Sequence, residues 1–188
     1  MLKGVRINGG LPVLKIVSNW KQFNVLRDIE STAAAKYFET GYDPSLWSTN
    51  HPEDFARYAA NDLLWVALWE NSPVGFAIAD IFRDALHLEE LDVLPEYQGR
   101  GIGTTLVNEV IAAARRRLMK TVTLRTFHTT PWSVGLYKKC GFQIIQETPY
   151  YLQLHLVNER NMGLPLDDRC TMLLSVQNMS DVSYSNPI

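Results

Sequence analysis

A glycine-rich stretch, Gln98-Gly99-Arg100-Gly101-Ile102-Gly103-Thr104, lies directly before a segment with the apolar periodicity of a helix. Glycine has no side chain, so a ligand can approach the backbone amides closely at such positions. The first turn of a helix leaves amides without an internal partner, and these amides together with the helix dipole bind phosphate. The stretch therefore predicts a phosphate-binding loop. The alternative is a plain turn that only starts a helix.

Two familiar phosphate-binding motifs do not match this loop. The P-loop requires a lysine after its last glycine, and no lysine stands there. The dinucleotide motif G-x-G-x-x-G requires a third glycine, but Thr104 and Leu106 occupy that position in the two available registers. A nucleotide-binding protein that uses the loop in another way stays a distant alternative.

Length and composition indicate one globular domain. The chain has 188 residues, of which 46% are hydrophobic and 20% charged, and these values are ordinary for a soluble protein. We expect a single domain over residues 1–176 and a polar, flexible tail over residues 177–188. The net charge of −2 argues against nucleic acid as the main partner.

The residue spacing supports no metal centre, disulfide framework or membrane segment. Cys140 and Cys170 are the only cysteines, and the four histidines are scattered without metal-ligand spacing, so we expect no metal. We find no secretory leader and no run of 18 apolar residues. We therefore expect a cytoplasmic protein with no membrane partner.

The apolar periodicity predicts strands and helices around this loop. Three consecutive strand-like runs, two of them joined by a hairpin turn at residues 70–73, indicate an antiparallel meander, and the strand–helix–strand that follows indicates a parallel pair. The predicted fold class is therefore α/β, with a mixed sheet and helices on both faces. Strands are expected at residues 11–17, 63–69, 74–82, 85–93, 121–127, 142–146 and 171–176, and helices at 19–39, 51–62, 105–118, 133–140 and 150–163.

A second motif, PWSVGLYKKCGF, stands at residues 131–142. The Q-x-x-G-x-G loop followed by L-Y-x-x-x-G-F resembles the GNAT superfamily of N-acetyltransferases, and in particular the subgroup with a TTF…PWN…Y…GF pattern. The resemblance extends from about Val13 to Val176. Ser133 and Gly135 stand where that subgroup has asparagine and proline.

The resemblance implies a GNAT-like acyl-CoA N-acyltransferase fold with a splayed sheet. In that family the sheet opens after its fourth strand, and the pantetheine arm of acyl-CoA enters the gap. Backbone groups of the fourth strand would contact the pantetheine and the thioester carbonyl, and the glycine-rich loop would wrap the pyrophosphate. The cofactor-binding residues implied in this way are Leu91, Asp92, Val93, Leu94, Gln98, Gly99, Arg100, Gly101, Ile102, Gly103, Thr104 and Ser133.

The resemblance also marks Tyr137 for catalysis, because a phenol beside the departing CoA thiolate can hydrogen-bond to it or protonate it. The alternative is an aromatic side chain packed beside Phe142. Glu89 and Glu90 are the candidates for a general base. Successive strand residues face opposite sides, and a bulge near the strand end could reverse which of the two faces the cleft. For each glutamate the alternative is a solvated or ion-paired carboxylate.

Glu30 lies on the apolar stripe of the first predicted helix, which is an unusual place for a carboxylate. This helix is near the acceptor site of the family, so Glu30 could attract the ammonium group of a substrate. The alternative is an ion pair with an arginine at the edge of the core.

These features together predict an enzyme, an acetyl-CoA-dependent N-acetyltransferase. It would transfer the acetyl group of its co-substrate acetyl-CoA to a primary amine of a small molecule, by direct attack in a ternary complex. Two alternatives stay open: a catalytically silent CoA-binding regulatory or sensor module, and acetylation of a protein N-terminus or lysine. Edge strands of such sheets often pair, which leaves a homodimer open as well.

Overall fold

The computed structural model describes residues 13–46, 49–130 and 132–177 of the chain. The first two residues of the predicted first strand and residues 178–188 of the predicted tail lie outside these ranges. The strands are β1 (Leu14–Val17), β2 (Leu64–Trp69), β3 (Ser72–Phe82), β4 (Ala85–Val93), β5 (Thr121–Phe127), β6 (Gln143–Ile145) and β7 (Arg169–Ser175). The α-helices are α1 (Phe23–Ala34), α2 (Pro52–Ala60), α3 (Ile102–Arg116), α4 (Ser133–Lys139) and α5 (Gln153–Asn161).

The seven strands form one mixed sheet in the order β1-β2-β3-β4-β5-β7-β6. Strands β1 to β4 pair antiparallel, and β4 pairs with β5 in parallel through the crossover helix α3. Both predictions of pairing, the meander and the parallel pair, are confirmed. Strand β7 lies between β5 and β6, antiparallel to both, an insertion that the strand pattern did not predict.

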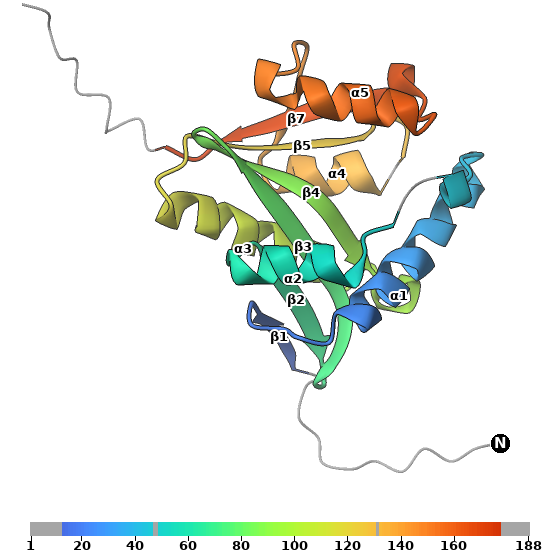
Figure 1. Cartoon of the computed structure of the whole chain (residues 1–188), viewed down its shortest axis with the longest axis vertical. Helices are drawn as coiled ribbons and strands as arrows, with labels where there is room; N and C mark the ends of the chain where they lie inside the picture. Colours follow the sequence, from blue (N-terminus) through green and yellow to red (C-terminus); the bar gives the residue numbers. More distant parts are fainter. Residues whose placement is uncertain (1–12, 47–48, 131, 178–188) are drawn as a thin grey trace, which may run out of the picture.

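The sheet separates between β4 and β5. Their parallel pairing covers Ala85 to Leu88 on one side and Thr121 to Leu124 on the other, and it ends there. Beyond this point β4 follows β3 as far as Val93, while β5 follows β7 as far as Phe127. The diverging strands are visible in Figure 1. A splayed mixed sheet is the architecture that the sequence resemblance implied.

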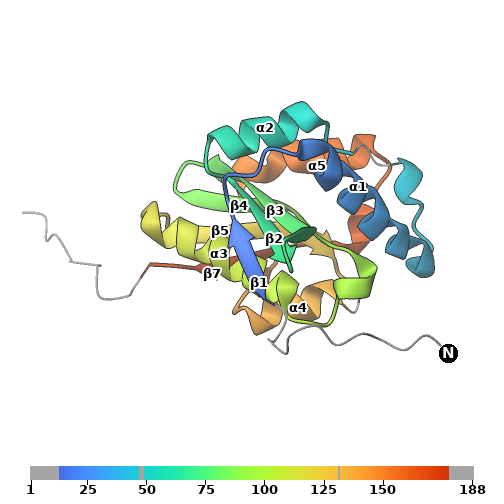
Figure 2. The same cartoon turned by 90° about the horizontal axis from the view of Figure 1, so that it is seen from below.

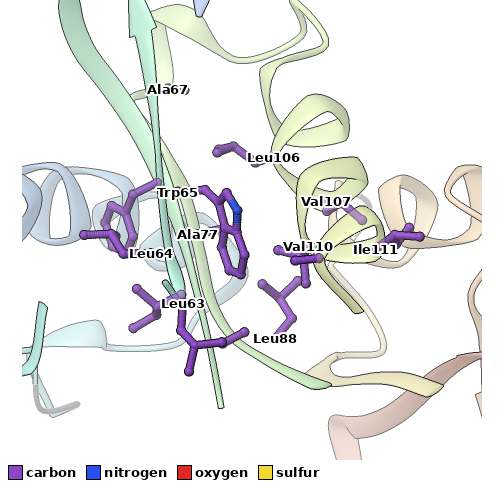
Figure 3. Close-up of a cluster of buried hydrophobic side chains, with 14 of the residues drawn as sticks. Leu63, Leu64, Trp65, Ala67, Ala77, Leu88, Leu106, Val107, Val110 and Ile111 are labelled. Carbon is purple, nitrogen blue, oxygen red and sulfur yellow. The ribbon is translucent and has the colours of Figure 1, made fainter. Parts of the chain in front are cut away.

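Helices cover both faces of the sheet, and the core lies on each side of the central strands. Helices α1, α2 and α5 lie on one face and α3 and α4 on the other (Figure 2). Adjacent residues of β2 serve the two faces, since strand side chains alternate. Trp65 points toward Val110 of α3, while Leu64 lies on the opposite side (Figure 3). Among the helices of the described ranges, none is long and apolar enough to span a membrane.

Helix α1 differs from its predicted bounds at both ends. It begins at Phe23 after a non-helical Gln22, whose carbonyl accepts a hydrogen bond from the Trp20 indole at 3.0 Å. It ends at Ala34, and the chain continues as a 3₁₀ helix over Ala35–Thr40. The tighter 3₁₀ turn stops at Gly41, which has a φ of 83° that favours glycine. The predicted start at Asn19 is therefore wrong by one turn.

Gly75 lets β3 approach β4 at the mouth of the splay. It pairs with Val93, and a β-carbon at this position would lie 2.6 Å from the Asp92 carbonyl oxygen, a backbone atom that cannot move alone. A β-carbon added to Gly135 in α4 would have no neighbouring atom within 4 Å. Close packing against β4 therefore requires glycine at position 75, whereas no such contact requires glycine at position 135.

We predict that alanine at these two glycines changes stability in opposite directions. Gly75→Ala should lower the free energy of unfolding by about 1–3 kcal/mol through overpacking. Gly135→Ala should raise it by about 0.5–1 kcal/mol, because a helix interior prefers alanine. Urea unfolding of both variants tests this, and an equal loss in the two would contradict the close approach of β3 and β4.

Candidate functional site

Two cavities open on the two sides of the separation between β4 and β5. The first has a volume of about 480 Å³ and lies among the end of β4, the glycine-rich loop and α4. The second has a volume of about 380 Å³ and lies among β4, β5, α1 and α5. Five residues line both cavities: Tyr37, Leu91, Asp92, Thr126 and Tyr137. The two cavities therefore meet where the strands have separated.

The first cavity ends at the N-terminus of α3. Gly101 caps this helix with a φ of 82°, and no side chain caps it, so the first-turn amides have no partner from a capping side chain. Gly99 has a φ of 74°, and both glycines have open space where a β-carbon would stand. A bare, positively polarised helix terminus that faces a cavity can bind phosphate.

Ten of the twelve predicted cofactor-binding residues line this first cavity. The other two are Leu94 and Arg100. The Leu94 amide donates to the Val74 carbonyl at 2.9 Å, so a contact of that amide with a cofactor would cost this bond. Arg100 lies over the rings of Trp69 and Tyr97 and donates to the Glu96 carbonyl at 3.1 Å. A role of Arg100 at a pyrophosphate therefore stays a prediction.

Ser133 lines the cavity, but its hydroxyl is engaged within the fold. It is hydrogen-bonded to the Thr130 hydroxyl and lies 3.2 Å from the Thr130 carbonyl and 3.4 Å from the Phe127 carbonyl. The side chain thus closes the turn before α4. Its contact with a cofactor also stays a prediction.

Lys36 is a cavity residue that the sequence analysis missed. Its ammonium group donates to the Gln98 side chain at 2.7 Å and lies 4.4 Å from the centre of the Trp132 ring. Gln98 in turn donates to the Val93 carbonyl at 2.9 Å. A single lysine on a 3₁₀ helix has no motif that would have identified it, because only the fold brings residues 36 and 98 together.

Tyr137 lies on α4 at the junction of the two cavities. The residue is 9% exposed, and its hydroxyl makes no hydrogen bond to the described part of the chain. Burial raises the pKa of the phenol above its ordinary value, and the nearby Tyr37, Glu90 and Asp92 raise it further. Tyr137 therefore keeps its proton at neutral pH and can act as a hydrogen-bond donor. The centres of the Tyr137 and Phe142 rings are 6.0 Å apart, so Tyr137 also packs beside Phe142, as the alternative interpretation expected.

A bulge places both candidate bases at the second cavity. The pairing of β3 with β4 shifts between Ile78 and Ala79, and Glu89 is the extra residue of β4. Simple alternation would have brought only one of the two glutamates to this side. Because the bulge turns the strand, Glu89 and Glu90 both line the cavity.

The carboxyl groups on β4 are held partly protonated by their surroundings. Burial raises the pKa of Glu89 to about 9, and the charges of Asp80 and Glu90 add to the shift. Burial and the charge of Glu30 raise the pKa of Glu90 to about 8. The pKa of Asp92 is also raised, by burial first and by Glu90 second. Such a cluster of half-buried acids would favour a cationic ligand.

Glu30 borders the same cavity and holds the loop that follows α1. Its carboxylate accepts hydrogen bonds from the amide and the side chain of Asn50, each at 3.1 Å. Its hydrogen-bond partner is thus Asn50; among the described residues it forms no ion pair with an arginine, although the charge of Arg27 acts to lower its pKa. Burial raises the pKa of Glu30 to about 7, against the opposing effect of the Asn50 hydrogen bonds.

A buried ion cluster forms the opposite wall of the second cavity. Glu159 of α5 accepts hydrogen bonds from Arg125 at 2.8 Å and from Arg169 at 2.7 Å. Burial alone would raise the pKa of Glu159, but the hydrogen bonds from these arginines outweigh it and lower the pKa. The cluster joins α5 to β5 and β7, so it fixes the width of the cavity.

Comparison with known sequences points to one family. A sequence model described as the acetyltransferase (GNAT) family matches residues 26–142, which is more than half of the chain. The uncharacterized N-acetyltransferase MJ1207 of Methanocaldococcus jannaschii is 26% identical over 152 residues, which cover 72% of this chain and 66% of that protein. The peptidyl-lysine N-acetyltransferase YjaB of Escherichia coli is 31% identical over 94 residues, 49% of this chain and 58% of that protein. Each match therefore spans just under two thirds of the relative or less.

Solved structures share the fold at low sequence identity. The PaiA N-acetyltransferase of Thermoplasma acidophilum, in complex with coenzyme A, has a TM-score of 0.68 at 15% identity and covers 87% of this chain and 99% of its own. The ribosomal-protein-S18-alanine N-acetyltransferase of Escherichia coli has a TM-score of 0.66 at 20% identity, with coverages of 92% and 99%. At such identities the likeness establishes the fold.

We predict that a charge at the loop abolishes binding of coenzyme A. Gly101→Glu places a carboxylate at the amides of the α3 terminus, where it would repel a pyrophosphate. Gly41→Glu is the matched control, because Gly41 has nearly the same φ and the same open surroundings but does not line the cavity. Calorimetric titration with coenzyme A should show lost binding in the first variant and unchanged binding in the second. Normal binding by Gly101→Glu would refute the loop assignment.

We predict that stability falls as pH rises from 6 to 8, in part because of Glu30. Its pKa is about 7 in the folded protein and 4.5 when unperturbed, so the folded state binds the additional proton. The stabilisation is complete below the unperturbed pKa and is lost as pH rises through about 7. Between pH 6 and 8, the melting temperature of Glu30→Gln should therefore decrease less than that of the natural chain. Equal losses would show that Glu30 ionises normally.

Proposed function

Because the chain belongs to the acetyltransferase (GNAT) family, we propose that it transfers the acetyl group of acetyl-CoA to a primary amine of a small molecule. The meeting of the two cavities at Tyr137 and Asp92 is the observation that carries this proposal. A donor in the first cavity and an acceptor in the second would reach each other only there. Direct attack in a ternary complex requires this geometry.

Acetyl-CoA would lie in the first cavity with its pyrophosphate at Gly101 and its thioester at the junction. Lys36 and Lys139 line this cavity and add positive charge for the phosphates. Past Leu88, β4 no longer pairs with β5, so amides of Glu89 to Val93 that point to that side would be available to the donor. One such amide aimed at the thioester oxygen would stabilise the tetrahedral intermediate by about 3 kcal/mol.

The reaction forms a C–N bond and breaks a C–S bond. The neutral amine attacks the thioester carbon, and the tetrahedral intermediate then expels the thiolate of CoA. Tyr137 would hydrogen-bond to that thiolate. A thiol has a pKa of about 8.5, well below that of a buried phenol, so donation of a hydrogen bond stabilises the leaving group without full loss of the tyrosine proton.

Glu90 and Asp92 would accept the proton that the ammonium group of the acceptor must lose. Asp92 lines both cavities, and its Oδ2 atom is buried without a hydrogen bond from the described residues. Glu90 interacts electrostatically with Asp92 and lines the acceptor side. Glu89 is a weaker candidate for this role, because its carboxylate lies 3.4 Å from His155, on α5.

The charge of the second cavity supports a cationic acceptor. Glu30, Asp80, Glu89, Glu90 and Asp92 line it, while the opposing arginines share Glu159. A protein amine is the second candidate, since YjaB is named for peptidyl-lysine. A panel of small primary amines, lysine peptides and peptides with free N-termini separates the two classes.

We predict that Tyr137→Phe lowers turnover at least tenfold and leaves affinity for acetyl-CoA nearly unchanged. Removal of the hydroxyl deletes the hydrogen bond to the leaving thiolate but keeps the packed ring. Thiol release with the amine panel measures the effect, and Tyr150→Phe, at an 87% exposed site, is the control. Unchanged turnover would exclude the leaving-group role. Binding of acetyl-CoA without thiol release from any amine would favour the silent CoA-binding module.

We predict a graded effect of neutral substitutions along β4. Glu90→Gln and Asp92→Asn should each lower kcat by about 100-fold, which is the usual loss for a general base. Glu89→Gln should lower it less, although Glu89 is the direct neighbour of Glu90. The same order in thiol-release assays supports the assignment, while a larger loss for Glu89→Gln would transfer the role to Glu89.

A further inference from the structure

Three polar side chains from two elements converge beside the second cavity: Glu89 and His155 line it, and His87 is buried next to them. His87 and Glu89 come from β4 and His155 from α5, and one potential ligand atom of each lies within 4.8 Å of the other two. The Nε2 atom of His155 is 3.4 Å from Oε1 of Glu89. The imidazole rings of His87 and His155 have centres 4.9 Å apart. The three residues span 69 positions of sequence, so only the fold assembles them.

His87 is fixed in orientation by β5. The residue is 2% exposed, and its Nδ1 atom lies 2.9 Å from the hydroxyl of Thr123, its partner in the parallel pairing. Nε2 has no hydrogen-bond partner within the described residues. With Nδ1–H donating to Thr123, Nε2 carries the free lone pair. A ligating histidine usually has its second nitrogen held in this way.

Glu89 brings an oxygen atom that lacks a partner. Its Oε1 atom is buried and accepts no hydrogen bond from the described part of the chain. An unsatisfied buried acceptor destabilises the folded state. The bulge at Glu89 therefore positions this carboxylate oxygen toward two imidazoles.

We propose that His87, Glu89 and His155 form a binding site for a divalent first-row transition-metal ion such as Zn²⁺. Two imidazole nitrogens and one carboxylate oxygen are a common ligand set for this ion, with the remaining position open to water. At metal–ligand distances of about 2.0–2.1 Å, two ligands of a tetrahedral ion lie about 3.3 Å apart. The separation of 3.4 Å between His155 and Glu89 fits this value.

A metal ion at this position would connect α5 to β4 beside Glu90. The ion is no cofactor of acyl transfer, because the proposed reaction uses amides, Tyr137 and carboxylates. It would instead place positive charge in the acceptor cavity beside Glu90, so Zn²⁺ should compete with a cationic amine. This last consequence rests on the proposed function, whereas binding of the metal does not.

The test uses the full chain without a histidine tag, stripped of metal by a chelator. Titration with Co²⁺ should give visible absorption of a four- or five-coordinate ion at one equivalent, and Zn²⁺ should displace it. Bands from thiolate ligands should be absent, since the free Cys140 and Cys170 are not in the cluster. Thermal unfolding should shift to higher temperature with Zn²⁺, because the ion joins two elements of the folded state.

His155→Ala should weaken Co²⁺ and Zn²⁺ binding at least tenfold. His155 is half-buried on a helix, so its removal should leave the fold intact. His128→Ala is the control, because His128 is exposed and outside the cluster. Absence of one-equivalent binding, full binding by His155→Ala, or equal weakening by His128→Ala would each overturn the proposal. None of these outcomes depends on acyl transfer, so a failed activity assay leaves the metal test unaffected.

Discussion

The end of backbone pairing between β4 and β5 is the constraint on which the site depends. After Leu88 and Leu124 the two strands have no hydrogen bonds to each other, and each continues on a different neighbour. The separation is stable because β3 and β7 satisfy the other edge of each strand. A fully paired sheet would close the space that both cavities share. The amides of β4 would then have partners in β5, and no thioester could reach them.

Electrostatics at the junction follows from this separation. The separated strands leave Glu90 and Asp92 half-buried along the cavities, where desolvation and mutual repulsion raise their pKa values. A cationic amine relieves both effects, since it neutralises charge that water no longer screens. The same surroundings keep Tyr137 protonated. The junction of the cavities thus combines two carboxylates that would accept a proton, Glu90 and Asp92, with a phenol that would donate a hydrogen bond, Tyr137.

The local sequence pattern was sufficient to predict elements that are marked by residue periodicity or by a motif within their own segment. Strands β4 and β5 have the predicted bounds, because alternating and β-branched residues end at clear turn or loop residues. The glycine-rich loop and Tyr137 were identified by motif, and both lie at the first cavity. The start of α1 was wrong because Gln22 is held outside the helix, an effect that apolar periodicity does not include.

Features that depend on distant parts of the chain were not predicted. The insertion of β7 between β5 and β6 follows from pairing across the sheet, and the bulge at Glu89 follows from register with β3. Lys36 meets Gln98, and His87 meets His155, only after folding. Single residues of common types give no local pattern, so three-dimensional proximity is the information that the sequence analysis lacked.

A crystal structure of the protein with coenzyme A tests the central claim most directly. We predict the pyrophosphate at the amides of α3, the pantetheine between the separated ends of β4 and β5, and the sulfur within hydrogen-bond distance of the Tyr137 hydroxyl. Coenzyme A bound outside this separation, or β4 and β5 paired along residues 89–93 in the complex, would contradict it.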